Sequence, residues 1–154
     1  MQQHIQGSLK QLMKSWYMFL FQLPILPELG LTVKRGDKMA KNLTDSSRPG
    51  TFNEEELEVY REAWTRPGAA TTMINWYRAG MRNRLKEKED QLRIKVPTLL
   101  IWGALDAYLG REMAKPSIDL CDDGRLVFIE EATHWVQHEE PERVNELLLE
   151  FLKR

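Results

Sequence analysis

The amino-acid sequence predicts an α/β protein in which a helical region, residues 1–92, precedes a β-α-β-α region, residues 93–154. Along much of the first region apolar residues recur at spacings of three and four, which is the period of an amphipathic helix. After residue 93 two short, continuous apolar runs appear, each followed by a segment of helical length. Continuous runs of this kind are typical of strands covered on both faces, so this order predicts half of a doubly wound sheet.

The first helix is expected over residues 3–22. Six apolar residues keep helical spacing there, namely Ile5, Leu9, Leu12, Met13, Trp16 and Leu20. Tyr17 and Phe21 lie beside that stripe, so the end of the helix is apolar nearly all round and burial on more than one side is expected. Pro24 and Pro27 end the helix. From this pattern alone, Tyr17 is a packed aromatic residue.

Two further helices follow in the same region. Asn53 with Glu56 forms a capping-box pattern for a helix through Trp64. After the break at Pro67-Gly68, a helical spacing joins Ala70, Met73, Ile74, Tyr77 and Met81, so Tyr77 points inward. The basic residues Lys34, Arg35, Lys38 and Lys41 are interpreted as a solvated helix face. The dense mixed charge of residues 78–95 predicts an exposed helix end and a linker.

The second region contains the two strands. They are predicted at Val96–Gly103 and Leu126–Ile129, with a helical segment at Arg111–Cys121 and a turn at residues 122–124 between them. Pro141 opens a terminal helix. One face of that helix carries Val144, Leu147, Leu148, Phe151 and Leu152.

Composition limits the classes of function. With 154 residues the chain can form one domain or two small lobes, and its formal net charge of −1 gives no reason to expect nucleic acid or an anionic membrane as a partner. The single cysteine, Cys121, excludes an internal disulfide and argues against a zinc site. No apolar run reaches the length of a membrane span, and residues 1–7 lack a secretory pattern. We therefore expect a cytoplasmic location.

Two residues able to do acid–base chemistry follow the predicted strands. Asp106 comes just after the first strand and His134 just after the second. In an open α/β sheet such residues meet beyond the carboxyl ends of the strands, so Asp106 could orient the imidazole of His134 as a general base in a catalytic triad. An equally good reading of the spacing makes Asp106 a helix cap and His134 an ordinary loop histidine. The spacing alone leaves both readings open.

Longer segments resemble a known family. Trp102-Gly-Ala-Leu-Asp106 and Glu131-Ala-Thr-His-Trp-Val-Gln-His-Glu-Glu-Pro141 resemble the acid and histidine segments of α/β-hydrolases, and most closely those of the epoxide hydrolases. Ser15-Trp-Tyr-Met-Phe-Leu-Phe-Gln-Leu-Pro24 and Asn75-Trp-Tyr-Arg78 resemble the two cap segments that carry the epoxide-binding tyrosines of that family. The resemblance covers about residues 5–153 and implies a partial α/β-hydrolase fold, with a helical cap followed by the last β-α-β-α of the core.

The resemblance implies a role for each matching residue. Tyr17 and Tyr77 would hold and protonate the epoxide oxygen, His134 would activate the water that hydrolyses an alkyl-enzyme ester, and Asp106 would orient His134. The product would be a vicinal diol, formed from a small-molecule epoxide without a metal or an organic cofactor. Three aromatic residues, Trp16, Trp76 and Trp135, could line the substrate pocket or simply pack.

The chain also departs from the family pattern. The mechanism needs an aspartate nucleophile on a strand–helix turn, and the sequence contains no Gly-x-Asp-x-Gly or Gly-x-Ser-x-Gly elbow. We therefore expect an incomplete C-terminal portion that is inactive by itself and whose partner is the missing N-terminal half of the fold. The alternatives are a non-catalytic fragment or association module, and a relative of the haloalkane dehalogenases.

Overall fold

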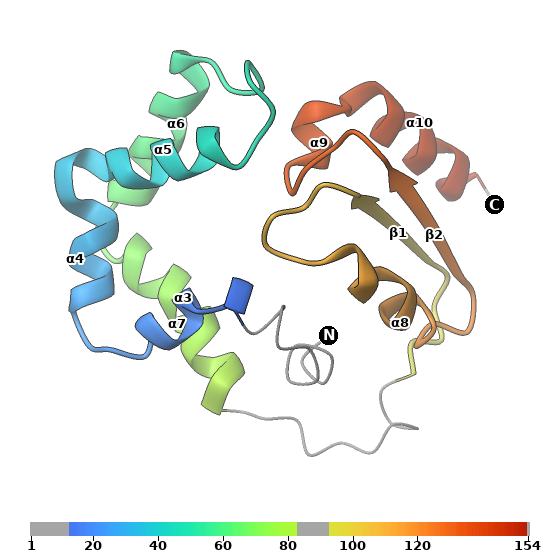
Figure 1. Cartoon of the computed structure of the whole chain (residues 1–154), viewed down its shortest axis with the longest axis horizontal. Helices are drawn as coiled ribbons and strands as arrows, with labels where there is room; N and C mark the ends of the chain where they lie inside the picture. The colour runs from blue at the N-terminus through green and yellow to red at the C-terminus, as the bar shows by residue number, and fades with distance from the viewer. Residues whose placement is uncertain (1–12, 83–92, 154) are drawn as a thin grey trace. The chain divides into compact units, whose positions relative to one another are not determined.

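A computed structural model describes residues 13–82 and 93–153 of the chain (Figure 1). These residues form two compact units. One runs from Ser15 to Arg82, and the other comprises residues 93–153 together with Met13 and Lys14. The expected boundary between residues 92 and 93 borders the range 83–92, which lies outside the described residues, so the division into a cap and a core at that point stays a prediction.

The helical unit begins with shorter elements than the sequence predicts. Helix α3 spans only Tyr17–Leu20, because Ser15 and Trp16 form a turn with three-residue hydrogen bonds, in which the N–H of Met18 donates to the carbonyl of Ser15. The expected single helix over residues 3–22 is therefore interrupted at Ser15 and Trp16 and ends at Leu20, while its start lies outside the described residues. The expected burial on several sides is also wrong, because no residue of α3 is buried.

Three short elements follow α3. Helix α4 spans Leu26–Thr32 with Pro27 in its first turn, the 3₁₀ turn η1 spans Val33–Gly36, and α5 spans Asp37–Asp45. Lys38 and Lys41 are exposed on α5, as predicted for a solvated face, whereas Lys34 and Arg35 lie in η1 with positive φ angles of 51° and 56°. The basic stretch is therefore a kinked turn followed by a helix.

The two longer helices of this unit match the sequence prediction. Helix α6 spans Glu54–Thr65, and both hydrogen bonds of its capping box are formed between Asn53 and Glu56. Helix α7 spans Ala69–Arg82. The core between these helices and α5 consists of Ala40, Leu43, Phe52, Leu57, Ala70 and Ile74. This packing fixes the helix that carries Tyr77.

The second unit is built on a parallel pair of strands. Strand β1, Thr98–Gly103, pairs with β2, Gly124–Ile129, in the register that places Gly103 opposite Ile129. Between them lie the 3₁₀ turn η3, Arg111–Met113, and helix α8, Ala114–Ile118. The short helix α9, Val136–Glu139, and the terminal helix α10, Pro141–Leu152, follow β2.

Helices cover both faces of this strand pair. Figure 1 shows α8 on one side of the strands and α10 on the other. Trp102 packs with Met113 and Ala114 in one cluster, and Ile129 packs with Ala132 and Val144 in a second. The two layers explain why both strands are continuous apolar runs without alternation. The predicted face of α10 is covered only in part, because Leu148 and Leu152 are exposed.

Among residues 13–82 and 93–153, no helix has the length and apolar character needed to cross a lipid bilayer.

Candidate active site

The turn after β1 holds the carboxylate of Asp106 in a fixed orientation. One carboxylate oxygen accepts hydrogen bonds from the backbone N–H groups of Tyr108, at 2.7 Å, and Leu109, at 2.9 Å. This is the local side-chain-to-backbone pattern that aspartate favours in turns. The Asp106 side chain is only 7% exposed. Its second oxygen remains available for another donor.

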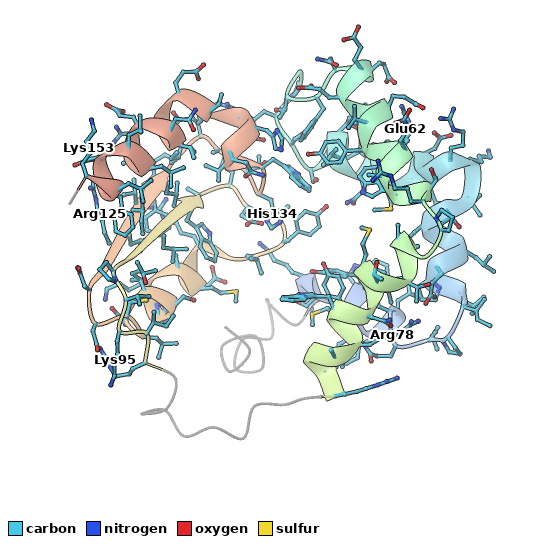
Figure 2. The ribbon with its side chains drawn as sticks, turned by 180° about the vertical axis from the view of Figure 1, so that it is seen from behind. Glu62, Arg78, Lys95, Arg125, His134 and Lys153 are labelled. Carbon is cyan, nitrogen blue, oxygen red and sulfur yellow. The ribbon has the colours of Figure 1, made fainter. Side chains whose placement is uncertain are left out.

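That donor is His134, in the loop that follows β2 (Figure 2). The imidazole Nδ1 lies 2.8 Å from the second carboxylate oxygen of Asp106. An ionised carboxylate can only accept, so Nδ1 carries the proton and the neutral ring keeps a lone pair on Nε2. The His134 side chain is 35% exposed. The parallel strands thus bring the two predicted residues together. The free lone pair on Nε2 is the feature that a general base needs.

Two aromatic rings restrict the imidazole further. The ring of Tyr108 lies 5.1 Å from that of His134 at an interplanar angle of 72°, and the ring of Trp135 lies 5.2 Å away at 90°. Edge-to-face contacts of this kind favour one ring orientation. Trp135 therefore packs against the histidine, and Tyr108 is a neighbour of the site that the motif comparison did not single out.

Backbone contacts join the two loops that carry the pair. The N–H of Ala104 donates to the carbonyl of Ile129 at 3.0 Å, and the N–H of Leu105 donates to that of Ala132 at 2.9 Å. A Cβ atom on Gly103 would lie 1.8 Å from the carbonyl oxygen of Thr133. The absence of a side chain at residue 103 is therefore what lets the loops approach closely enough for Asp106 to reach His134.

A buried carboxylate holds the histidine loop from its other end. Both oxygens of Glu139 accept from Thr133, one from its backbone N–H and one from its hydroxyl, each at 2.6 Å. Glu139 is buried. Sequence reasoning missed this residue, because it treated Glu139 only as part of the histidine segment. The available signal was an acidic residue five positions after the histidine.

The site keeps Asp106 ionised. Burial raises the pKa of this carboxyl, but the hydrogen bond from His134 and those from the N–H groups of Leu109 and Tyr108 together lower it further. The net effect is a pKa for Asp106 below its ordinary value. The carboxylate therefore stays charged throughout the neutral range, where it can fix the tautomer of His134.

This lowered pKa predicts a loss of stability in acid. A carboxyl whose pKa is lower in the folded state contributes stability above its unfolded pKa, and that contribution disappears as the pH falls through the folded value. For Asp106 the loss is expected below about pH 4, the ordinary range of an aspartate. Urea unfolding at several pH values measures it. Asp106→Asn should flatten the acid limb, whereas Asp123→Asn, which changes an exposed turn residue, should leave the limb unchanged. Identical limbs in both variants would contradict the assignment.

The other two predicted residues lie together in the helical unit. The rings of Tyr17, on α3, and Tyr77, on α7, have centroids 5.7 Å apart at 82°. Phe21 packs against both, with its ring 5.7 Å from Tyr17 and 5.0 Å from Tyr77. Both tyrosines are half-buried. The structure therefore forms one tyrosine pair and one aspartate–histidine pair, in different units.

Two of the three tryptophans that were predicted to line a substrate pocket or to pack lie in the helical unit. Trp16 and Trp76 are exposed. One groove in this unit has a volume of about 530 Å³ and a lining that includes the polar side chains of Gln22, Glu28, Asn75 and Arg78. No tryptophan is among its lining residues. A contact between the substrate and any of the three tryptophans therefore stays a prediction.

The described parts of the chain, 13–82 and 93–153, contain no cluster of three or more histidine, cysteine, aspartate or glutamate side chains that could hold a metal ion.

Comparison with known proteins identifies relatives over nearly the whole sequence. The chain is 44% identical over 143 residues to the AB hydrolase superfamily protein YfhM of Bacillus subtilis, a match that covers 93% of this chain and 49% of the relative. It is 36% identical to epoxide hydrolase 1 of Caenorhabditis elegans, covering 97% of this chain and 38% of that one. The chain therefore spans about half the length, or less, of these relatives. No family model matches the sequence.

Solved structures give the same result for the fold. An epoxide hydrolase from Bacillus megaterium superposes with a TM-score of 0.80 at 21% identity, covering 99% of this chain and 56% of the other. Parallel strands that are each followed by a member of an aspartate–histidine pair, combined with this superposition, define a partial α/β-hydrolase fold. The chain belongs to the α/β-hydrolase superfamily. Over most of its length it is also similar to proteins named as epoxide hydrolases.

Proposed function

We propose that this chain supplies two parts of an epoxide hydrolase: the tyrosines that assist ring opening and the aspartate–histidine pair that hydrolyses the resulting ester. The observation that carries the proposal is the 2.8 Å contact between Nδ1 of His134 and Asp106. Such a contact leaves Nε2 of a neutral imidazole free to accept a proton from water. The similarity to proteins named as epoxide hydrolases supports an epoxide as the substrate.

In the first step an aspartate carboxylate attacks an epoxide carbon. A new carbon–oxygen ester bond forms, the ring carbon–oxygen bond breaks, and the ring oxygen takes a proton from a tyrosine hydroxyl. Tyr17 and Tyr77 are proposed to hold that oxygen, and either hydroxyl can supply the proton. The nucleophile is proposed to come from polypeptide outside these 154 residues, because the sequence has no elbow that would present one.

In the second step His134 removes a proton from water through Nε2. The hydroxide attacks the ester carbonyl carbon, the acyl–oxygen bond breaks, and the leaving alkoxide takes the proton of the carboxylic acid so formed to give the vicinal diol. The imidazolium of His134 then releases its proton and the tyrosinate left by the first step regains one, which restores both side chains. The nucleophilic carboxylate is regenerated. Asp106 remains ionised, which stabilises the imidazolium that forms during the attack. The sum of both steps is the addition of one water molecule to one epoxide.

The direct test is complementation. The 154-residue chain is mixed with, or fused to, the segment of the Bacillus subtilis relative that it does not cover, and an aryl epoxide is offered. Diol formation by the combination, with none from either part alone, is the expected result. Turnover by this chain alone would show that the nucleophile lies within it. If the complex assembles and still forms no diol, the non-catalytic alternative is favoured.

Removal of one tyrosine hydroxyl is expected to slow ring opening. Tyr17→Phe or Tyr77→Phe removes one donor to the developing alkoxide, which should cost about 2–4 kcal/mol in the barrier by analogy with oxyanion donors. The rate of ester formation in a single turnover measures this. Tyr60→Phe is the matched control, because Tyr60 lies in the same unit but stacks on Trp64. Equal rates in all three variants would exclude both tyrosines from the reaction.

A further inference from the structure

Arg78 begins a charged stretch that was predicted to be exposed, yet its side chain is covered and donates several hydrogen bonds. Its side chain is only 13% exposed. The guanidinium donates to the carbonyl of Phe21 at 2.9 Å and to that of Leu23 at 2.7 Å. It also donates to both oxygens of Glu28, at 2.6 Å and 3.2 Å. These acceptors lie 50–57 residues away along the chain.

These contacts connect the two segments that carry the tyrosines. Arg78 follows Tyr77 directly on α7, and Phe21 is the residue immediately after α3, the helix of Tyr17. Phe21 is itself the ring that packs against both tyrosines. One side chain therefore holds the backbone of Phe21 at a fixed distance from α7, while the Phe21 ring lies beside both phenols.

The geometry depends on the shape of the guanidinium. A planar group with five donors can serve two carbonyls and a carboxylate together, and it stays charged at all physiological pH values. A lysine carries a single point charge and cannot reach acceptors on several sides in this way. The hydrogen bond from Arg78 also lowers the pKa of Glu28 and so keeps its partner ionised.

We propose that Arg78 is a positioning residue that sets the spacing of Tyr17 and Tyr77, and thereby aligns their hydroxyls for epoxide opening. This rests on the function proposed above. Arg78 does not touch the substrate in this role. It acts through the backbone of the segment 21–23 and through the ring of Phe21. The competing explanation is that Arg78 only stabilises the helical unit.

The matched control is Arg61, which lies in the same unit. Its side chain is 17% exposed and is paired with Asp37, Glu54 and Glu58 at 3.1–3.6 Å. These partners lie in α5 and α6, away from the tyrosine segments. Arg61→Gln therefore removes a largely covered, ion-paired arginine whose paired carboxylates lie in neither α3 nor α7.

The first arm of the experiment needs no activity. The chain has four tyrosines, so labelling their ζ-carbons with ¹³C gives four NMR signals. In Arg78→Lys and in Arg78→Gln we expect the signals of Tyr17 and Tyr77 to move while that of Tyr108 stays in place. In Arg61→Gln the signals of Tyr17 and Tyr77 should not move. Unchanged Tyr17 and Tyr77 signals in both folded Arg78 variants would overturn the proposal, whatever the activity.

The second arm uses the complemented enzyme. Arg78→Lys should slow ester formation at least tenfold and leave the rate of ester hydrolysis unchanged, since His134 lies in the other unit. Equal slowing of both steps would indicate a purely structural role and overturn the proposal. The proposal would also be overturned if the Arg78 variants shift the tyrosine signals but form the ester at the normal rate, while Tyr17→Phe forms the ester more slowly. A failure of the proposed function itself gives a different result, which is ester formation at the full rate in the Tyr17→Phe enzyme. That result would also exclude the positioning role, because the role depends on the tyrosines.

Discussion

Replacement of His134 by glutamine is expected to stop diol formation while the alkyl-enzyme ester accumulates. The glutamine amide can still donate to Asp106, so the loop keeps its anchor, but it has no lone-pair nitrogen to accept a proton from water. A positioned general base contributes about 10²–10⁴-fold to a rate, and the hydrolysis of the ester should fall by that factor. Ring opening, which depends on the nucleophile and the tyrosines, should continue for one turnover.

Mass spectrometry of the complemented enzyme after exposure to an epoxide measures this outcome. The polypeptide that carries the nucleophile should gain the mass of one substrate molecule in the His134→Gln enzyme and only briefly in the unchanged one. His138→Gln is the control, because His138 is an exposed residue of α9 four positions away, and it should retain turnover. Lost activity without an accumulated adduct would show that His134 does not act on the ester.

The parts of the site that are local in sequence could be predicted. Continuous apolar runs end at Gly103 and Ile129, and parallel pairing places the loops after both strands at one edge of the sheet. The meeting of Asp106 and His134 is therefore a consequence of the pattern. The capping box at Asn53 is equally local, and both of its hydrogen bonds are formed. The capping box is fixed by a few neighbouring backbone angles, and the aspartate–histidine pair by the parallel pairing of two strands that the sequence marks clearly.

Contacts that depend on distant backbone could not be predicted in the same way. Arg78 was expected to be exposed because neighbouring residues are charged, yet its acceptors include carbonyls of a segment more than fifty residues earlier. Backbone acceptors are present at every residue and leave no trace in a sequence pattern. The break at Ser15 and Trp16 was missed for a related reason, since helical spacing continues through it and only the hydrogen bonding reveals the turn.

The burial of apolar residues could be predicted only in part. The sequence places Val144, Leu147 and Leu148 on one face of α10, but only the first two are buried, while Leu148 is exposed. Periodicity identifies which residues share a face, whereas burial depends on what lies against that face. The same holds for Trp16 on the short turn before α3, which has the spacing of a core residue and is exposed.

Gly103→Ala is expected to be the most damaging small substitution in the α/β unit. An added Cβ would lie 1.8 Å from the carbonyl oxygen of Thr133 and 2.7 Å from that of Ala132. Both neighbours are backbone atoms, so no side chain can rotate away and the two loops must separate. Separation strains the hydrogen bonds from Ala104 and Leu105 across the gap. Overpacking in a buried site costs about 1–3 kcal/mol and occasionally more, and we expect about 3 kcal/mol or more here.

Native-state hydrogen exchange of the β1 amides measures this loss, since it reports the stability of the unit itself. Gly30→Ala is the matched control: nothing lies within 4 Å of an added Cβ there, and the glycine is inside α4. Alanine at residue 30 should raise local stability by about 0.5–1 kcal/mol. Because Thr133 precedes His134, the Gly103→Ala chain should also lose the downfield proton signal of the imidazole Nδ1–H. Retention of that signal at full stability would mean that the aspartate–histidine contact does not depend on the close approach of the two loops.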